Sequence, residues 1–387
     1  MRYLLLRLKR FCGFITGFVF FFSGILKLLD PVGAGLVMDE YFHFLHIGFM
    51  GFAAKPLGVA LALLETLIGT ALLTGVWRKI TTLAAMAFQG FFTFLTLLLV
   101  IFNPDMDCGC FGEAVHLTHM QTFLKNLVLC ALLAIFYFPA KFLGEPKPRK
   151  YVSFGLVAVS TVLFMIYSLV HIPLVDFTEF KPTAVLQVGD HAKFEDELYD
   201  ARFTYEKDGV QETFSLGHLP DSSWTFVSAE TVRKNEEHDM VVLSFHDKDG
   251  EYMDDLAGTG KVMIVSVYDP DIKEDRWLKI KRFLDRASAE GFTSLLLTAG
   301  EPENYDGDYY LADYKTLITL NRSNGGATYF DEGNLISKWA YANLPDKAEL
   351  AEVINEHSTG LVIEEDIEGS LGFQGFLLYV FAVMLLL

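Results

Sequence analysis

The sequence lacks a phosphate-binding loop, a dinucleotide-binding glycine fingerprint and any basic cluster of the kind that binds nucleic acid. Acidic residues outnumber basic ones by 49 to 31, so the formal net charge is −18. These absences argue against a nucleotide-hydrolysing enzyme and against a nucleic-acid partner. Cysteine is also scarce, because the 387 residues include only four and none lies between residues 173 and 368. Any disulfide chemistry must therefore use cysteines outside that region.

Apolar residues, by contrast, are abundant for so acidic a chain. They make up 52% of the sequence, 35 of them are Phe, and the mean hydropathy is +0.32. The charge is unevenly divided, since residues 173–368 carry a net charge of −23 and the rest of the chain carries +5. This division predicts a basic membrane part joined to an acidic, water-exposed part.

Five apolar segments are long enough to cross a bilayer, which takes about 20 helical residues. They lie around residues 11–29, 57–77, 80–102, 122–143 and 151–172. A sixth segment, residues 371–387, is short and has no polar flank after it, so it is either an incomplete span or a short anchor. The basic start MRYLLLRLKR resembles a signal peptide, but no small-residue cleavage site follows it. We therefore expect a retained first helix.

The short loops alternate in charge, which predicts the membrane orientation. The basic residues beside the expected spans are Arg2, Arg7, Lys9, Arg10, Arg78, Lys79, Lys147, Arg149 and Lys150, and they fall in every second loop. Because such loops face the cytoplasm, we expect a cytoplasmic amino terminus in the inner membrane. Cys108, Cys110 and residues 173–368 would then face the outside, where the compartment is oxidising and disulfides persist.

The stretch DCGCFG places Cys108 and Cys110 one residue apart, directly after the third expected span. A disulfide across this spacing closes a small, strained ring, and strained disulfides are the more easily reduced ones. Gly109 has no Cβ and reaches backbone angles that such a ring requires. Because a structural disulfide gains most from closing a long loop, the spacing favours a redox-active pair. A pair of plain thiols or of metal ligands stays open.

Two histidines provide the metal alternative. Cys108, Cys110, His116 and His119 are four ligands of types that zinc or copper accepts, within twelve residues. Against this hypothesis, CxC and HxxH differ from the common zinc spacings. His43 and His46 lie on the same expected side and are more typical of interfacial packing. Acidic neighbours of the cysteines, Asp105, Asp107 and Glu113, disfavour a thiolate, whereas the start of the fourth span near Thr122 favours one.

Glu65 falls in the middle of the second expected span, where an ionisable group is costly and usually paired or functional. Lys27, near the outer end of the first span, is a potential partner, and Gln89 and Asn126 add polar atoms in the third and fourth spans. One interpretation is an ion pair that fixes helix packing. The other is a proton or quinone site, because oxidation of a dithiol releases two protons that need an acceptor. Cys12 and Cys130 are most simply small apolar side chains in helices.

Three stretches of the first 170 residues resemble the DoxX/MauE-type redox-associated membrane proteins. They are FSGILKLLDPVG from Phe22, LALLETLIGTALLTGVWRK from Leu61 and DCGCFGEAVHLTHMQTFLKN from Asp107. The resemblance in architecture is greatest to the members of this group in which a MauE-like bundle continues into a large extracytoplasmic domain. The resemblance implies a four-helix redox bundle over residues 1–145, a role in thiol–disulfide chemistry and an extracytoplasmic protein partner. More remotely, it implies coupling to a membrane quinone, as in the vitamin K epoxide reductase type.

Beyond the bundle we expect a fifth transmembrane helix at 146–172, a β-rich segment at 173–240 and an α/β domain at 241–368. From Lys261 on, the pattern reads strand, helix, strand, then the segment ITLNRS, a hairpin and a final helix from about Asp346, an order that resembles a thioredoxin-like domain. Where a thioredoxin carries CxxC, this chain has Asp269, Pro270, Asp271 and Ile272. The outer domain therefore cannot exchange disulfides itself.

The sequence thus leads to three hypotheses. The first is a thiol–disulfide redox protein in which Cys108 and Cys110 pass electrons between an extracytoplasmic partner and a membrane quinone, supported by Gly109, Glu65 and Lys27. The second is a metal-handling membrane protein that uses the cysteines and histidines of the same loop. The third is a non-catalytic scaffold whose outer domain binds a partner.

Overall fold

The fold is described from a computed structural model. The structure describes residues 2–104, 106, 108–115, 117–137, 146–182, 184–187, 199–207, 210–215, 224–233, 240–356 and 358–387. The chain divides into two compact units, and each is treated by itself. The first, called here the membrane unit, comprises Met1–Thr178 with Asp366–Leu387, and the second, the outer unit, comprises Glu179–Glu365.

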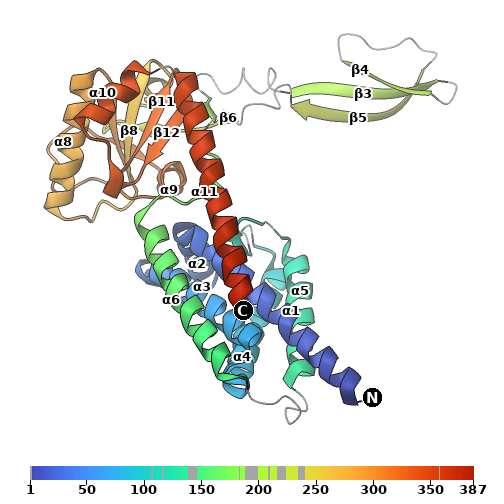
Figure 1. Ribbon diagram of the computed structural model, residues 1–387. Helices are drawn as coiled ribbons and strands as arrows, with labels where there is room; N and C mark the ends of the chain where they lie inside the picture. Colours follow the sequence, from blue (N-terminus) through green and yellow to red (C-terminus); the bar gives the residue numbers. More distant parts are fainter. Residues whose placement is uncertain are drawn as a thin grey trace. The chain divides into compact units, whose positions relative to one another are not determined.

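The membrane unit is a bundle of helices (Figure 1). Its elements are α1 (Arg2–Leu29), α2 (Pro31–Phe44), the 3₁₀ helix η1 (Gly48–Ala53), α3 (Ala54–Thr74), α4 (Arg78–Phe102), the short strand β1 (Cys110–Glu113), α5 (His119–Tyr137), α6 (Pro148–Val170) and the carboxyl-terminal part of α11 (Ser358–Leu386). Asp30 caps α2 by accepting a hydrogen bond from the Gly33 N–H, and Pro31 occupies the first helical position. This cap turns the chain sharply between α1 and α2.

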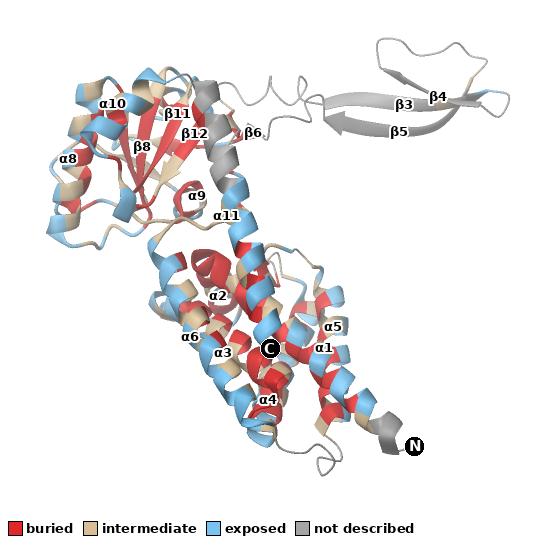
Figure 2. Ribbon diagram, in the orientation of Figure 1, coloured by how far each residue is buried: buried red, intermediate tan, exposed pale blue. Residues whose placement is uncertain are grey.

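Five helices within the described residues are long and apolar enough to cross a membrane, as the sequence predicts. They are Leu6–Leu29, Gly48–Thr74, Arg78–Phe102, His119–Tyr137 and Pro148–Val170, and the apolar helix Ser370–Leu386 is shorter. The end of the predicted fourth span, residues 138–143, lies outside the described part. Figure 2 shows α6 exposed along much of its length, with side chains such as Val159 and Leu163 more than half exposed. The chain is a multi-pass membrane protein, and these exposed apolar side chains suit contact with lipid.

Helices α1 and α3 pack with their backbones in close contact because glycine lies at the crossing. A Cβ on Gly24 would lie 2.2 Å from the Oγ1 atom of Thr66, and one on Gly69 would lie 2.4 Å from the backbone nitrogen of Phe21. Small residues permit such approaches between membrane helices. Lys27 lies one turn beyond Gly24, so the close crossing brings its side chain toward α3.

The outer unit contains an eight-stranded mixed sheet in the order β6-β2-β12-β11-β8-β9-β10-β7. The central strands are β8 (Lys261–Val267), β9 (Thr293–Thr298), β11 (Gly326–Asp331) and β12 (Asn334–Trp339), and the outer ones are β10 (Tyr310–Ala312), β7 (Phe245–His246), β2 (Val185–Leu186) and β6 (Met240–Val241). Strands β8 and β9 run parallel, and β11 pairs antiparallel with both β8 and β12. The predicted α/β class of this region is confirmed.

Helix α8 (Glu274–Glu290) connects the parallel strands β8 and β9, as a parallel pair requires. Its buried side chains, including Trp277 and Phe283, form one core with β8, β11 and α10 (Lys347–Asn355). Helix α9 (Tyr314–Leu320) contains the first half of the segment ITLNRS and contributes none of its residues to that core. The strand, helix, strand, hairpin and helix predicted from Lys261 onward are all present.

The predicted β-rich segment divides between two sheets. Strands β2 and β6 pair with each other in the large sheet, where β2 also pairs with β12. Strands β3 (Tyr199–Lys207), β4 (Val210–Ser215) and β5 (Thr225–Arg233) form a separate antiparallel sheet in the order β4-β3-β5. None of these strands contains cysteine.

Candidate functional site

The cysteine loop connects α4 to α5 and is folded against the bundle. Helix α4 ends at Asn103, which adopts a left-handed conformation with φ +42°, and the chain then turns back through Cys108 to β1. Gly112 of β1 is buried, and a Cβ built on it would lie 3.6 Å from the Cα atom of Lys27. The loop therefore lies directly against the outer part of α1.

Two hydroxyl groups anchor the backbone of the cysteine pair. The Ser23 Oγ atom, on α1, donates a hydrogen bond to the carbonyl oxygen of Cys110 at 2.5 Å. The Tyr41 hydroxyl, on α2, donates to the carbonyl oxygen of Cys108 at 3.1 Å. Burial raises the pKa of the Tyr41 phenol, which keeps it protonated and able to donate. Each carbonyl of the pair is thus held by a different helix.

Gly109 adopts a conformation that other residues rarely take. Its φ is +58°, and a Cβ at this position would lie 2.1 Å from the Cγ1 atom of Val37 on α2. Both the left-handed backbone and the close contact exclude a side chain here. Glycine is therefore required for the loop to pass between the cysteines while in contact with α2.

The two thiols have different environments. Cys108 is 5% exposed and packs in an apolar cluster with Tyr41, Leu95 and Leu99, whereas Cys110 is partly exposed. All four cysteines of the chain are thiols in the structure. Cys12 is buried in the apolar core of the bundle, and the Cys130 sulfur lies 3.3 Å from the Thr93 hydroxyl. A reagent from solvent would therefore meet Cys110 before Cys108.

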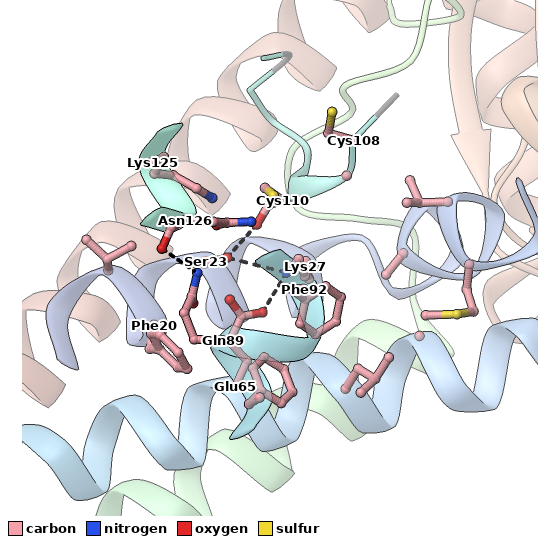
Figure 3. A pocket seen from close by; sticks show the side chains of 18 of the residues that line it. Phe20, Ser23, Lys27, Glu65, Gln89, Phe92, Cys108, Cys110, Lys125 and Asn126 are labelled. Atoms are coloured by element: carbon pink, nitrogen blue, oxygen red, sulfur yellow. Dashed lines mark hydrogen bonds and ion pairs between the residues drawn. The ribbon is translucent and has the colours of Figure 1, made fainter. Parts of the chain in front are cut away.

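Lys27 and Glu65, the two charges identified in the sequence, form an ion pair inside the bundle. The Lys27 Nζ atom lies 2.5 Å from Glu65 Oε2 and 3.4 Å from Ser23 Oγ, and the side chains of the pair are 16% and 11% exposed. Because Ser23 also holds the Cys110 carbonyl, a continuous polar chain runs from Glu65 through Lys27 and Ser23 to the cysteine loop (Figure 3).

One cavity brings these groups together. It has a volume of about 60 Å³, and its lining includes Cys108, Gly109, Cys110, Ser23, Lys27, Glu65, Tyr41, Gln89, Phe92, Lys125 and Asn126. One water needs ~10–15 Å³ by this measure, so the cavity has room for several. Figure 3 shows Cys110 between Cys108 and the ion pair, with Lys125 and Asn126 of α5 beside it. All five residues assigned to the site from the sequence, Cys108, Cys110, Gly109, Glu65 and Lys27, line this cavity.

The amides of α4 and α5 also contribute to the cavity. Gln89 donates to the backbone carbonyl of Asn126 at 3.5 Å, and the Asn126 side chain donates to the Thr96 hydroxyl at 3.2 Å. The Lys125 Nζ atom lies 4.6 Å from the centre of the Phe111 ring, a cation–π distance. These contacts fix α5 against the loop and keep a second cation at the cavity.

The metal alternative rests on Cys108, Cys110, His116 and His119, of which His116 lies outside the described part. Among the described residues no group of three or more His, Cys, Asp or Glu side chains is placed to hold a metal ion. The two ring nitrogens of His119 lie 3.3 Å from Asn103 Oδ1 and 3.0 Å from the Met106 carbonyl oxygen. His43 pairs with Asp39 at 3.6 Å, and His46 contacts the Phe44 carbonyl. These histidines are thus engaged with protein groups.

Sequence reasoning missed three residues of the site, Ser23, Tyr41 and Lys125. A signal existed for Ser23, which precedes Lys27 by one helical turn and so shares its face. Lys125 belongs to the LTxxQTFxKN pattern that follows the cysteines. Tyr41 gave no signal, because its role depends on the packing of α2 against a loop far along the chain.

All described residues that line the cavity belong to the part of the chain from α1 to α5. A comparison with known families covers this part of the chain. Residues 3–139 match the family model of the methylamine utilisation protein MauE. The MauE match thus includes every residue that lines the cavity. Residues 199–235, which include the strands β3, β4 and β5, match a domain of unknown function, DUF8463. No solved structure matches the chain.

The chain is also similar to Protein TlpB of Flavobacterium psychrophilum. The two are 24% identical over 169 residues, which are 42% of this chain and 45% of that protein. The chain therefore spans less than half of the length of this relative. The MauE-matching segment and this partial similarity agree with a membrane protein built on a helical bundle.

Proposed function

We propose that this protein is a membrane thiol–disulfide oxidoreductase in which Cys108 and Cys110 are the redox pair. The observation that carries the proposal is the shared cavity, which is lined by both cysteines and by the Lys27–Glu65 pair. The MauE match supports a redox-associated role for the same segment. A disulfide-bearing protein on the outer side and a membrane quinone are the proposed reaction partners.

Oxidation of the Cys108 and Cys110 thiols forms one S–S bond and releases two electrons and two protons, and a quinone that accepts all four becomes the quinol. In the reverse sense, the two thiols reduce a partner's disulfide to two thiols. Glu65 is the proposed relay group, which takes the thiol protons through water in the cavity and passes them on to the quinone.

The cysteines have distinct proposed roles. Cys110 is the more exposed thiol and its backbone is joined through Ser23 to Lys27, so Cys110 meets the partner first. Among the described lining residues, the cations Lys27 and Lys125 outnumber the anion Glu65. Cys108, packed among apolar side chains, then resolves the mixed disulfide by attacking the Cys110 sulfur.

Thiol trapping in intact cells tests this proposal. A Cys12→Ser, Cys130→Ser variant leaves Cys108 and Cys110 as the only cysteines, and an alkylating reagent then counts their free thiols with and without prior reduction. A redox pair gains two alkylated thiols on reduction, and a membrane quinone analogue returns them to the oxidised form. If Cys108→Ser and Cys110→Ser variants keep full function, the proposal fails and a scaffold role is favoured. If the pair is always reduced and a chelator increases its alkylation, the metal alternative is favoured.

The proposed orientation, an inner-membrane protein with a cytoplasmic amino terminus and residues 173–368 outside, has its own test. In a cysteine-free background, Glu303→Cys in the outer unit and Lys79→Cys at the start of α4 place single thiols at exposed positions. We expect a membrane-impermeant maleimide to label the first in intact cells and the second only after lysis. The opposite labelling would reverse the orientation.

A further inference from the structure

A second cavity lies at the other end of the membrane helices. It has a volume of about 610 Å³ and is lined by residues at the start of α1, the end of α3, the start of α4, the end of α5 and the start of α6. The cysteine loop follows the end of α4, whereas this cavity includes Arg78, the first residue of α4. The second cavity thus lies toward the end of the helices opposite the cysteine loop, and nothing in the redox proposal uses it.

Positive charge converges on this cavity from three helices. Among the described residues, its lining contains the cations Arg10, Arg78, Lys147 and Lys150 and no Asp or Glu. Lys150 also contacts the backbone carbonyl oxygen of Leu387. Like charges that share a partly enclosed space repel one another and create a strongly positive potential. An anion in the cavity would relieve that repulsion.

Apart from Thr74, the other described side chains of the lining are apolar, and aromatic side chains flank the cavity. Phe14, Leu72 and Phe136 line the cavity together with the cations. Directly before Arg78, the Trp77 ring meets the rings of Tyr151 and Phe154 edge-on, with centroids 5.6 and 5.4 Å away. Trp and Tyr gather where a membrane meets water. The cavity therefore lies at the level of the lipid head groups and offers cations next to apolar surface.

We propose that this cavity binds the phosphate group of an anionic membrane phospholipid, with Arg10, Arg78 and Lys147 as the binding cations. Basic pockets between membrane helices bind lipid head groups in this way, and Arg pairs with phosphate through two parallel hydrogen bonds. A free phosphate ester would satisfy the cations equally. The lipid is favoured because Phe14, Leu72 and Phe136 provide apolar surface for its acyl chains. The loop ends of five helices would be held together by the bound lipid.

Binding can be measured on the purified full-length protein in detergent by native mass spectrometry and by its thermal unfolding midpoint. The probes are phosphatidylglycerol, phosphatidylcholine with the same acyl chains, and glycerol phosphate, which has no acyl chains. We expect phosphatidylglycerol to bind and raise the midpoint, with a much smaller effect of phosphatidylcholine. Each of Arg10→Gln, Arg78→Gln and Lys147→Gln should weaken phosphatidylglycerol binding about fivefold.

Lys79→Gln and Arg149→Gln are the matched controls, since they remove cations from the same ends of α4 and α6 without touching the cavity lining. We expect both to bind phosphatidylglycerol as the unmodified protein does. Equal loss in the control and cavity variants, or equal binding of the two lipids, would overturn the proposal. If equimolar glycerol phosphate displaces phosphatidylglycerol, the ligand is a free phosphate ester and the proposal of a bound lipid is wrong. If Arg78→Gln does not fold, phosphatidylglycerol binding by Arg10→Gln and Lys147→Gln tests the proposal.

Discussion

The Nζ atom of Lys27 lies 2.5 Å from Glu65 Oε2, inside a bundle of membrane helices. The two residues are brought together by the crossing of α1 and α3, where Gly24 and Gly69 allow backbone contact. The pair is joined to the Cys110 carbonyl through Ser23. The charge pair and the cysteine pair therefore belong to one hydrogen-bonded unit. A substitution at Lys27 or Glu65 should therefore also affect the cysteine loop.

Removal of one member of this pair should destabilise the bundle more than removal of both. An isolated buried charge costs about 3–5 kcal/mol when its partner is deleted, and since both side chains retain some exposure we expect about 2 kcal/mol for Lys27→Met or Glu65→Gln. The double variant should recover most of that loss because no unpaired charge is left. Thermal unfolding of the full-length protein in detergent measures the stability of each variant. Lys79→Met is the control, because it removes an exposed cation. A double variant as unstable as the sum of the singles would show that the pair does not couple.

Gly109→Ala should disturb the cysteine loop specifically. The left-handed backbone costs a side chain about 1–2 kcal/mol, and the new Cβ would overlap Val37. We expect a lower unfolding midpoint and faster alkylation of Cys108, because the loop must move away from α2. Adding Val37→Ala should recover part of the loss by removing the overlap. Gly90→Ala is the control, since no atom lies within 4 Å of a Cβ at that helical position.

The stability of the outer unit should decrease at low pH, partly because Asp346, the N-cap of α10, becomes protonated. Its side chain accepts hydrogen bonds from the backbone N–H groups of Glu349 and Ala348, which hold the pKa of the carboxyl below its ordinary value. A lowered folded-state pKa gives stability that is present above the unfolded pKa of about 3.9 and lost as the pH falls through the folded value.

Two substitutions at this position separate the charge from the cap. Asp346→Asn keeps an acceptor and removes the titration, so the unfolding midpoint should fall less between pH 6 and pH 3 than in the unmodified protein. Asp346→Ala should lower the midpoint across that whole range, because it removes the acceptor as well. An unchanged pH dependence in the Asn variant would exclude the carboxyl as a source of acid sensitivity.

Much of the fold follows from patterns that are local in the sequence. The five spans are runs of apolar residues, and β8 reads as a continuous apolar strand because it is buried on both faces. Glu65 and Lys27 are conspicuous because charges are rare within spans. These features depend on composition and periodicity, which a single sequence displays directly.

The remaining parts of the site depend on contacts between distant segments. Ser23 and Cys110 are separated by 87 positions, and Tyr41 and Cys108 by 67. No periodicity encodes such pairs, since they arise from how α1 and α2 pack against a loop. The cavity itself likewise forms only where six segments meet, namely α1 to α5 and the cysteine loop. For the same reason the basic cavity around Arg10 and Lys147 is visible in the sequence only as positive charge beside the spans.

Tyr41→Phe should change the alkylation rate of Cys108 and leave that of Cys110 nearly unchanged. The variant removes the hydroxyl that donates to the Cys108 carbonyl and keeps the ring that packs against Leu95 and Leu99. Leaving a buried carbonyl without its donor costs about 1–3 kcal/mol, so the loop should open more often at this point. In a background whose only cysteine is Cys108, the alkylation rate should rise about tenfold, which corresponds to 1.4 kcal/mol of opening. With Cys110 as the only cysteine the rate should change little, because Ser23 still holds that carbonyl. Equal acceleration at both thiols would mean that the loop moves as one body and that Tyr41 anchors all of it.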